Sequence, residues 1–180
     1  KRLPVSISVE EVEALLNAPN LDKQEGVRDR ALLEVMYSSG LRVSELLGLK
    51  MKMINFEFGM LKIIGKGNKQ RHVPIGEWAL DYLKQYIEGP RKKNPGKNTE
   101  FVFLNRYGKP LSRQYFFLQV KKYAEQVRIV GEVLHSRRHS DNIHKLVKTL
   151  KEIIFISCKI CDSRKVNGYY ANRTCAFTGT

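Results

Sequence analysis

Residues 53–75 read MINFEFGMLKIIGKGNKQRHVPI, and their apolar side chains recur at the spacing of β-strands rather than of helices. Gly59 interrupts this pattern once, and the glycine- and lysine-rich turn at 65–69 interrupts it again. The β-like runs are 54–56, 61–64 and 72–75. We therefore predict a small three-stranded antiparallel sheet whose last connection is a basic turn.

The sequence on both sides of this segment follows helical spacing. Ser8 and Glu11 form an S-x-x-E capping box before a helix over about 9–18, and a mostly buried helix is expected from Arg28 to the break at Gly40. Further helices are expected to begin at Val43, to run from Trp78 to near Gly89-Pro90, and to cover about 113–127 after an N-cap at Ser112. The predicted fold class is α+β, mostly α-helical, with one small antiparallel sheet.

The charge of the chain narrows the classes of partner. The 180 residues include 32 Lys and Arg against 18 Asp and Glu, which gives a formal net charge of +14. A surplus of this size favours a polyanionic partner, because each phosphate that a cation neutralises releases condensed counterions. Nucleic acid is the favoured class. A basic surface that merely keeps the protein soluble, or an RNA-binding or ribosome-associated domain, is the alternative.

The sequence argues against a membrane protein and against a disulfide scaffold. Its longest apolar run near the C-terminus, 153–156, is far shorter than the ~20 residues that span a bilayer, and no apolar signal core opens the chain. We expect a cytoplasmic protein. All three cysteines lie in the last quarter, where Cys158 and Cys161 have the spacing of half a zinc site. Cys175 and His144 are possible further ligands, but their spacing matches no recognised zinc motif. We therefore predict reduced thiols and no metal.

The segment 38–49 holds the first candidate for chemistry. Arg42 follows Gly40 directly before a predicted helix, and Glu45 lies three residues further on the same face. An arginine so placed can be presented to an anion while the carboxylate orients its guanidinium. An ordinary surface ion pair is the alternative interpretation.

Two further basic clusters could contact phosphate. Lys66 lies between two glycines in the last turn of the predicted sheet, which lets the backbone approach a partner closely. Around it lie Lys62, Lys69 and Arg71, and no acidic residue occurs from 61 to 76. His135 and Arg138, three residues apart, would share a helix face and could meet one phosphate. A solvated basic hairpin and a basic helix end are the alternatives. The basic loop 91–97 is a further candidate for contact with the DNA backbone.

Three motifs occur in an order and spacing that resemble a known family. They are RDRALL at 28–33 with GLRVSEL at 40–46, IGKGNKQRHVPI at 64–75, and HSRRHS at 135–140. Together they resemble the catalytic domain of the tyrosine recombinases, the phage integrase family, and specifically its Xer type. The resemblance covers about residues 1–140, which we predict to be one catalytic domain.

The resemblance implies a DNA strand-exchange enzyme that needs neither metal nor nucleotide cofactor. In this family a tyrosine attacks the scissile phosphate and forms a 3′-phosphotyrosyl link. The resemblance assigns Arg42 and Arg138 to stabilising charge on the phosphate, Lys66 to protonating the leaving oxygen and His135 to assisting proton transfer. Glu45 would support Arg42. The implied partners are double-stranded DNA and further recombinase protomers, in a homo- or hetero-tetramer on the DNA.

The sequence departs from the family pattern at both ends. The chain begins near the usual start of the catalytic domain, so we expect the N-terminal DNA clamp to be missing. Tyr170 lies 32 residues after Arg138, about where the family has its nucleophile, but its flanking residues differ. We interpret residues 141–180 as a frameshifted or otherwise replaced tail. The alternative function is a truncated, catalytically inactive recombinase remnant that only binds DNA.

Overall fold

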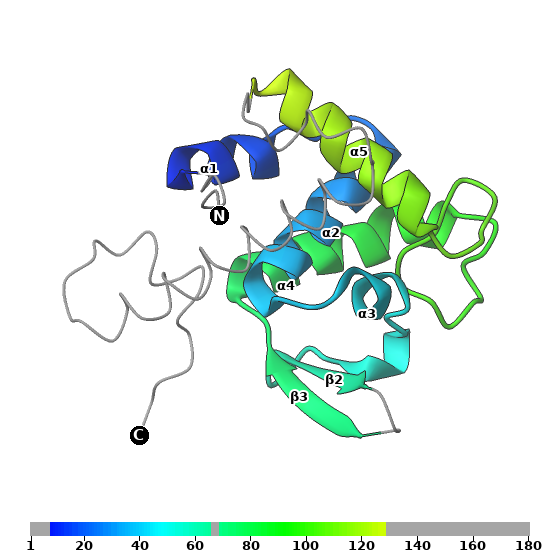
Figure 1. The fold of residues 1–180 in the computed structure, drawn as a ribbon. Helices are drawn as coiled ribbons and strands as arrows, with labels where there is room; N and C mark the ends of the chain where they lie inside the picture. The colour runs from blue at the N-terminus through cyan, green and yellow to red at the C-terminus, as the bar shows by residue number, and fades with distance from the viewer. Residues whose placement is uncertain (1–7, 66–68, 129–180) are drawn as a thin grey trace, which may run out of the picture.

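The computed structural model describes residues 8–65 and 69–128 of the chain. Figure 1 shows the helices gathered in one body and the sheet at its lower end, with α3 lying between them. In chain order the elements are α1 (Val9–Asn17), α2 (Gln24–Ser39), α3 (Val43–Leu47), the 3-10 turn η1 (Met51–Met53), β1 (Ile54–Asn55), β2 (Met60–Ile64), β3 (Gln70–Pro74), α4 (Glu77–Tyr86), the π-helical turn η3 (Ile87–Arg91) and α5 (Arg113–Gln126).

Two helix starts depend on the caps that the sequence predicts. At α1 the Ser8 hydroxyl accepts the Glu11 N–H at 3.2 Å, and the Glu11 carboxylate accepts the Ser8 N–H at 2.8 Å. At α5 the Ser112 hydroxyl accepts the Tyr115 N–H at 3.1 Å. These side chains satisfy N–H groups that have no partner within the helix. Both predicted N-caps are confirmed.

Helix α2 begins at Gln24, four residues before the predicted start at Arg28. Its N-cap, Lys23, makes no side-chain hydrogen bond, so the sequence carries no capping signal there. A Cβ on Gly26 would lie 1.8 Å from the Asn20 carbonyl oxygen, so the preceding turn packs directly on the helix backbone. The close packing on a glycine explains why the helix extends through a segment predicted to be a loop.

The sheet has the predicted three antiparallel strands in the order β1-β2-β3. In its register Lys62 pairs with His72 and Ile63 pairs with Arg71. Because side chains alternate across a strand, Ile63 and Arg71 lie on one face, and Lys62 and His72 lie on the other. Ile63 is buried, so Arg71 lies on the face that packs toward the helices.

The core lies between the helices and the inner face of the sheet. Helix α4 runs beside α2 in Figure 1, and both helices contribute buried apolar residues to one cluster. Fully buried members with the largest side chains include Leu15, Leu32, Leu41, Leu46, Leu49, Leu61, Leu83 and Phe103. Burial of these side chains supplies the main stabilisation of the fold. No helix in the described part of the chain is long and apolar enough to cross a membrane.

Arg91 does not belong to the basic surface predicted for 91–97. Its side chain is buried, and within the described residues its guanidinium donates hydrogen bonds to main-chain carbonyls alone. The acceptors are the carbonyl oxygens of Lys97, Thr99, Phe101 and Val102, at 2.7–3.2 Å. Helix α4 ends at Tyr86 and the π-helical turn continues past Gly89-Pro90, which directs Arg91 inward. Arg91 therefore stabilises the loop rather than contacting a partner.

A buried polar cluster joins α2 to α5. Arg28 donates from Nε to Asp29 Oδ1 at 2.8 Å and from Nη2 to the Tyr115 hydroxyl at 2.7 Å. The Tyr123 hydroxyl donates to Asp29 Oδ2 at 2.8 Å, and Arg28 Nη1 donates to the Leu104 carbonyl at 3.2 Å. Burial raises the pKa of the Asp29 carboxyl, and Arg28 offsets only part of that rise. The cluster fixes how α5 packs on α2.

Candidate active site

Arg42 lies at the N-cap of α3, directly after the turn that ends α2. Its N–H donates to Glu45 Oε2 at 2.9 Å, and its Nη1 donates to Glu45 Oε1 at 3.1 Å. Glu45 is the third residue of α3, so its carboxylate reaches back over the first helical turn. The structure contains the i, i+3 ion pair that the spacing of these residues predicts.

Arg71 reaches the same carboxylate from β3. Its Nη1 donates to Glu45 Oε1 at 3.0 Å and its Nη2 donates to Glu45 Oε2 at 2.8 Å, which is a bidentate pair. The strand register makes this contact possible, because Arg71 lies on the inner face of the sheet beside Ile63. We call Arg42, Glu45 and Arg71 the Glu45 cluster.

Glu45 is ionised over the whole physiological range. Partial burial would raise the pKa of its carboxyl, but hydrogen bonds from Arg71 and from the Arg42 backbone and side chain outweigh burial and hold the pKa at about 2. Its side chain is 10% exposed. The carboxylate is therefore a fixed negative charge that holds two arginines in place.

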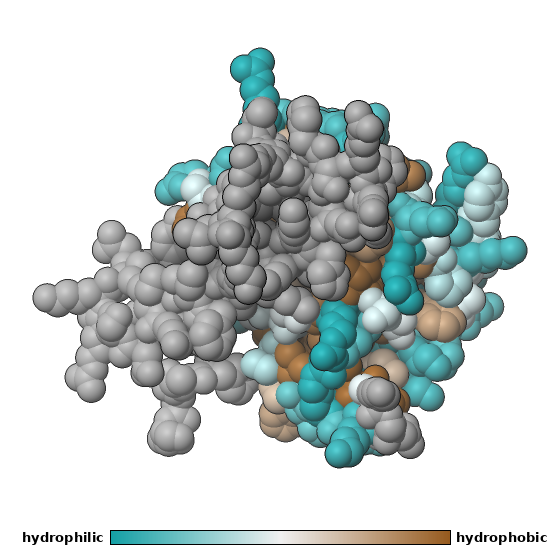
Figure 2. Space-filling model, viewed as in Figure 1, coloured by the Kyte–Doolittle hydropathy of each residue, from teal (hydrophilic) through white to brown (hydrophobic). Residues whose placement is uncertain are grey.

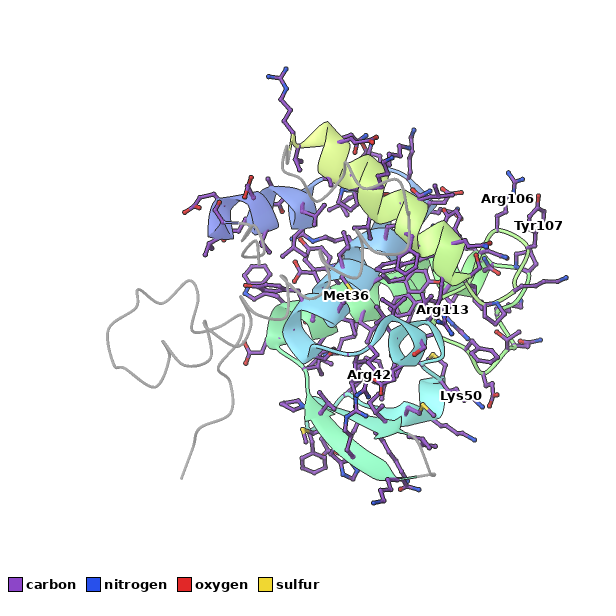
Figure 3. All side chains as sticks on the ribbon, in the orientation of Figure 1. Met36, Arg42, Lys50, Arg106, Tyr107 and Arg113 are labelled. Carbon is purple, nitrogen blue, oxygen red and sulfur yellow. The ribbon has the colours of Figure 1, made fainter. Side chains whose placement is uncertain are left out.

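The Arg42 guanidinium is open to solvent. Its side chain is 71% exposed, and in the described residues it donates a single side-chain hydrogen bond, to Glu45. Figure 3 shows Arg42 in the region between α3 and the sheet. A guanidinium has five N–H donors in a planar fork that matches phosphate oxygens. Arg42 is thus oriented by one bond while its other donors are free for an anion.

The basic turn between β2 and β3 adjoins this cluster. The Gly65 N–H donates to the Lys69 carbonyl at 2.8 Å and closes the base of the turn. A Cβ on Gly65 would lie 3.6 Å from Arg71 Nη1. The base of the turn therefore lies close to the Glu45 cluster.

Lys62 lies on the opposite face of the sheet from Arg71. With His72 and the aromatic side chains Phe56 and Phe58 it lines an open hollow of about 570 Å³. In the orientation of Figure 1, Figure 2 shows hydrophilic side chains over most of the described surface, with apolar ones exposed among them around the sheet. The sequence prediction grouped Lys62 with Lys69 and Arg71, whereas the structure separates Lys62 from Arg71.

The remaining predicted site residues lie outside the described residues. These are Lys66, His135, Arg138 and Tyr170, together with His144, Cys158, Cys161 and Cys175. In the described part of the chain no group of three or more His, Cys, Asp and Glu side chains could hold a metal ion. The structure thus brings together Arg42 and Glu45, as predicted, and adds Arg71.

Comparison with known proteins places these residues in a family. The model of the phage integrase family matches residues 6–146 of this chain. The chain belongs to the phage integrase family. A tyrosine recombinase XerD of Staphylococcus saprophyticus is 43% identical over 148 residues, which are 81% of this chain and 50% of that protein. The XerD of Staphylococcus aureus strain N315 gives the same identity and coverage. This phage integrase family member spans about half the length of these relatives.

Solved structures of recombinases resemble the fold of this chain. XerH bound to difH in a pre-cleavage complex has a TM-score of 0.68 at 23% identity and covers 99% of this chain and 49% of that one. The XerH post-cleavage complex has a TM-score of 0.62 at 28% identity, and the match covers 72% of this chain and 38% of that chain. A lambda integrase tetramer bound to a Holliday junction has a TM-score of 0.53 at 14% identity, and the match covers 97% of this chain and 49% of that chain. The predicted fold of the phage integrase family's catalytic domain is confirmed.

The contact between Arg71 and Glu45 is the part of the site that sequence reasoning missed. The two residues are 26 positions apart, so helical spacing cannot reveal the pair. The alternation of the strand carries part of the signal, because residues 71 and 73 share a face with the buried side chains of β2. A basic residue on that face needs an acidic partner from the body of the protein.

Proposed function

We propose that this phage integrase family member is the catalytic part of a site-specific DNA recombinase, which cleaves and rejoins double-stranded DNA in chromosome dimer resolution or DNA integration. The Arg42 guanidinium carries the proposal, because it is oriented by Glu45 and keeps most of its donors free for a phosphate. The 43% identity to proteins named tyrosine recombinase XerD supports the same activity.

The proposed chemistry exchanges one phosphate ester for another. The Tyr170 hydroxyl oxygen attacks the scissile phosphorus, and the bond from phosphorus to the 5′ oxygen breaks. A 3′-phosphotyrosyl link forms, Lys66 gives a proton to the leaving 5′ oxygen, and His135 assists proton transfer. A 5′-hydroxyl from a partner strand then attacks the link and releases Tyr170. Ester bonds are conserved throughout, so no nucleotide cofactor is required.

The arginines have an electrostatic role in this scheme. Negative charge grows on the non-bridging oxygens as the phosphorus becomes five-coordinate, and forked N–H donors stabilise that charge. We assign this role to Arg42 and Arg138. Glu45 keeps Arg42 in position throughout the physiological pH range, because hydrogen bonds from both arginines lower its pKa to about 2.

The proposed substrate determines the partners and the location. Lys62 and Lys69 would contact the DNA backbone, and further recombinase protomers would complete a tetramer on the DNA. The XerH structures contain the difH substrate and the lambda integrase tetramer is bound to a Holliday junction, which supports this arrangement. A cytoplasmic location follows from the DNA substrate. We further propose that residues 1–140 are the catalytic domain and that residues 141–180 are a replaced tail.

A covalent-trapping experiment tests the proposal. The full chain is first used to select a binding duplex from a randomised pool. Nicked versions of that duplex, with the nick moved one position at a time across the footprint, then serve as suicide substrates. We expect a covalent protein–DNA adduct on a denaturing gel with the wild-type chain. The Tyr170→Phe variant should give no adduct, because phenylalanine lacks the attacking oxygen.

Tyr169→Phe is the matched control, since it removes the neighbouring hydroxyl and leaves Tyr170 intact. The control should form the adduct at the wild-type level. An adduct that disappears in Tyr169→Phe instead would move the nucleophile by one residue. Tight binding without an adduct at every nick position would contradict the enzyme and support the inactive DNA-binding remnant.

A further inference from the structure

The Glu45 carboxylate accepts four hydrogen bonds, and Arg71 supplies two of them. Both guanidinium nitrogens of the Arg71 fork are used, at 3.0 and 2.8 Å. Arg42 supplies its backbone N–H at 2.9 Å and only one guanidinium nitrogen at 3.1 Å. Of the two arginines, Arg71 is thus the one whose side chain is committed to the carboxylate.

Exposure separates the two arginines in the same way. The Arg42 side chain is 71% exposed, whereas that of Arg71 is 41% exposed and shares its face of the sheet with buried Ile63. A residue that meets a phosphate needs free donors that face solvent. Arg42 fits this requirement, and Arg71 fits the role of holding the carboxylate behind Arg42.

Arg71 also lies close to the base of the β2–β3 turn. Its Nη1 would lie 3.6 Å from a Cβ on Gly65, and Gly65 is bonded through its N–H to the Lys69 carbonyl. Arg71 therefore links two elements that are separate in the chain, β3 and the start of α3. A bidentate pair between them restricts both distance and orientation.

We infer that Arg71 is a positioning residue for strand cleavage: from β3 it holds the Glu45 carboxylate, and through that carboxylate it holds Arg42. This inference rests on the proposed function. It replaces the role in DNA contact that the charge pattern predicts for Arg71. Arg71 acts through other groups and does not touch the reacting phosphate.

The test separates the rate of cleavage from the strength of DNA binding. On the suicide substrate we expect Arg71→Met to slow adduct formation by saturating enzyme about 10- to 100-fold, because small displacements of reacting groups have large effects on rate. The Kd for the intact duplex should change by less than about threefold, and the slope of log Kd against log salt should stay as in wild type. A lost phosphate contact would instead lower that slope by about one.

Two further variants test that the effect passes through Glu45. Arg71→Lys keeps the charge but not the fork, so it should recover only part of the rate. Combining Arg71→Met with Glu45→Gln should slow cleavage no more than the slower single variant does, because both remove the same link. Lys121→Met on α5 is the control, since its ion pair with Glu125 is exposed and 3.7 Å long, and it should leave rate and binding unchanged.

The outcomes distinguish this inference from the proposed function. No adduct with the wild-type chain would overturn both. A wild-type adduct together with an unimpaired rate in Arg71→Met, or with a salt slope lowered by about one, would overturn the positioning role alone. If Arg71→Met does not fold by circular dichroism, Arg71→Lys decides by the same criteria.

Discussion

Two of the arginine–carboxylate clusters in the described part of the chain use the same chemistry for different ends. Arg28 and Asp29 lie between α2 and α5 with side chains 5% and 8% exposed, and their partners are two tyrosine hydroxyls and a main-chain carbonyl. In the Glu45 cluster the carboxylate accepts four hydrogen bonds, but the Arg42 side chain is 71% exposed. An arginine whose three guanidinium nitrogens all donate hydrogen bonds fixes the packing of helices. An arginine that donates from one nitrogen to a fully bonded carboxylate is available to a ligand.

The contribution of the buried cluster to the free energy of unfolding cannot be judged from its ion pair alone. Removing two charges from water costs free energy that their attraction offsets only in part, so such pairs add little net stability. Taking one partner away is different, because it leaves the other charge buried and unpaired. The comparison therefore predicts a strong response to single substitutions in the buried cluster and a weak one at Arg42.

The largest effect is expected from Arg28→Met. We expect this change to lower the free energy of unfolding by about 3–5 kcal/mol, because Asp29 loses its countercharge and remains buried. Urea denaturation at neutral pH measures the change. Arg28→Met combined with Asp29→Leu should recover most of the loss, because no charge is then left unpaired. A loss below about 1 kcal/mol for Arg28→Met would mean that water replaces the guanidinium and that the cluster is not closed.

An intermediate effect is expected from Glu45→Gln. At neutral pH it should lower the free energy of unfolding by about 1–2 kcal/mol, since charge-assisted bonds to both arginines become neutral ones. In the wild-type chain the pKa of Glu45 is lowered from 4.5 to about 2, so the stabilisation is complete above pH 4.5 and is lost as pH falls toward 2. The stability gap between wild type and Glu45→Gln should narrow over that window. A gap that is constant from pH 6 to pH 2.5 would contradict the ionised cluster.

The smallest effect on stability is expected from Arg42→Ala. The free energy of unfolding should change by at most about 0.5 kcal/mol, because the side chain is exposed and makes one surface ion pair. Adduct formation on the suicide substrate should nevertheless fall by about 100- to 1,000-fold, the usual effect of removing a donor that stabilises charge in the transition state. If stability and cleavage fell together, Arg42 would be a structural residue like Arg28.

Local signals in the sequence predicted most of the fold. The capping box at Ser8, the N-cap at Ser112 and the change of period at 53–75 each act over a few residues, and each was found in the structure. The start of α2 was predicted four residues late, because the contact that sets it is between Gly26 and the Asn20 carbonyl and leaves no capping motif.

The candidate site was predicted less completely, for a physical reason. Arg42 and Glu45 are neighbours on one helical turn, so their spacing reveals the pair. The role of Arg71 depends on the strand register, and the burial of Arg91 depends on the carbonyls of a loop ten residues away. Charge counting treats every basic residue as exposed, and only the folded structure separates those that bind carboxylates or carbonyls from those that face solvent.

The site depends on a left-handed backbone conformation at Gly40, the C-cap residue of α2. Its φ is +60°, a backbone conformation that costs an L-residue about 1–2 kcal/mol, and no atom lies within 4 Å of a Cβ built there. The restriction at this position is therefore one of backbone conformation and not of space, so Gly40→Ala would be strained although its Cβ would meet no neighbour. Gly40 has no chiral Cα. Its backbone conformation sets the direction in which the chain enters α3, and with it the direction in which the Arg42 side chain points.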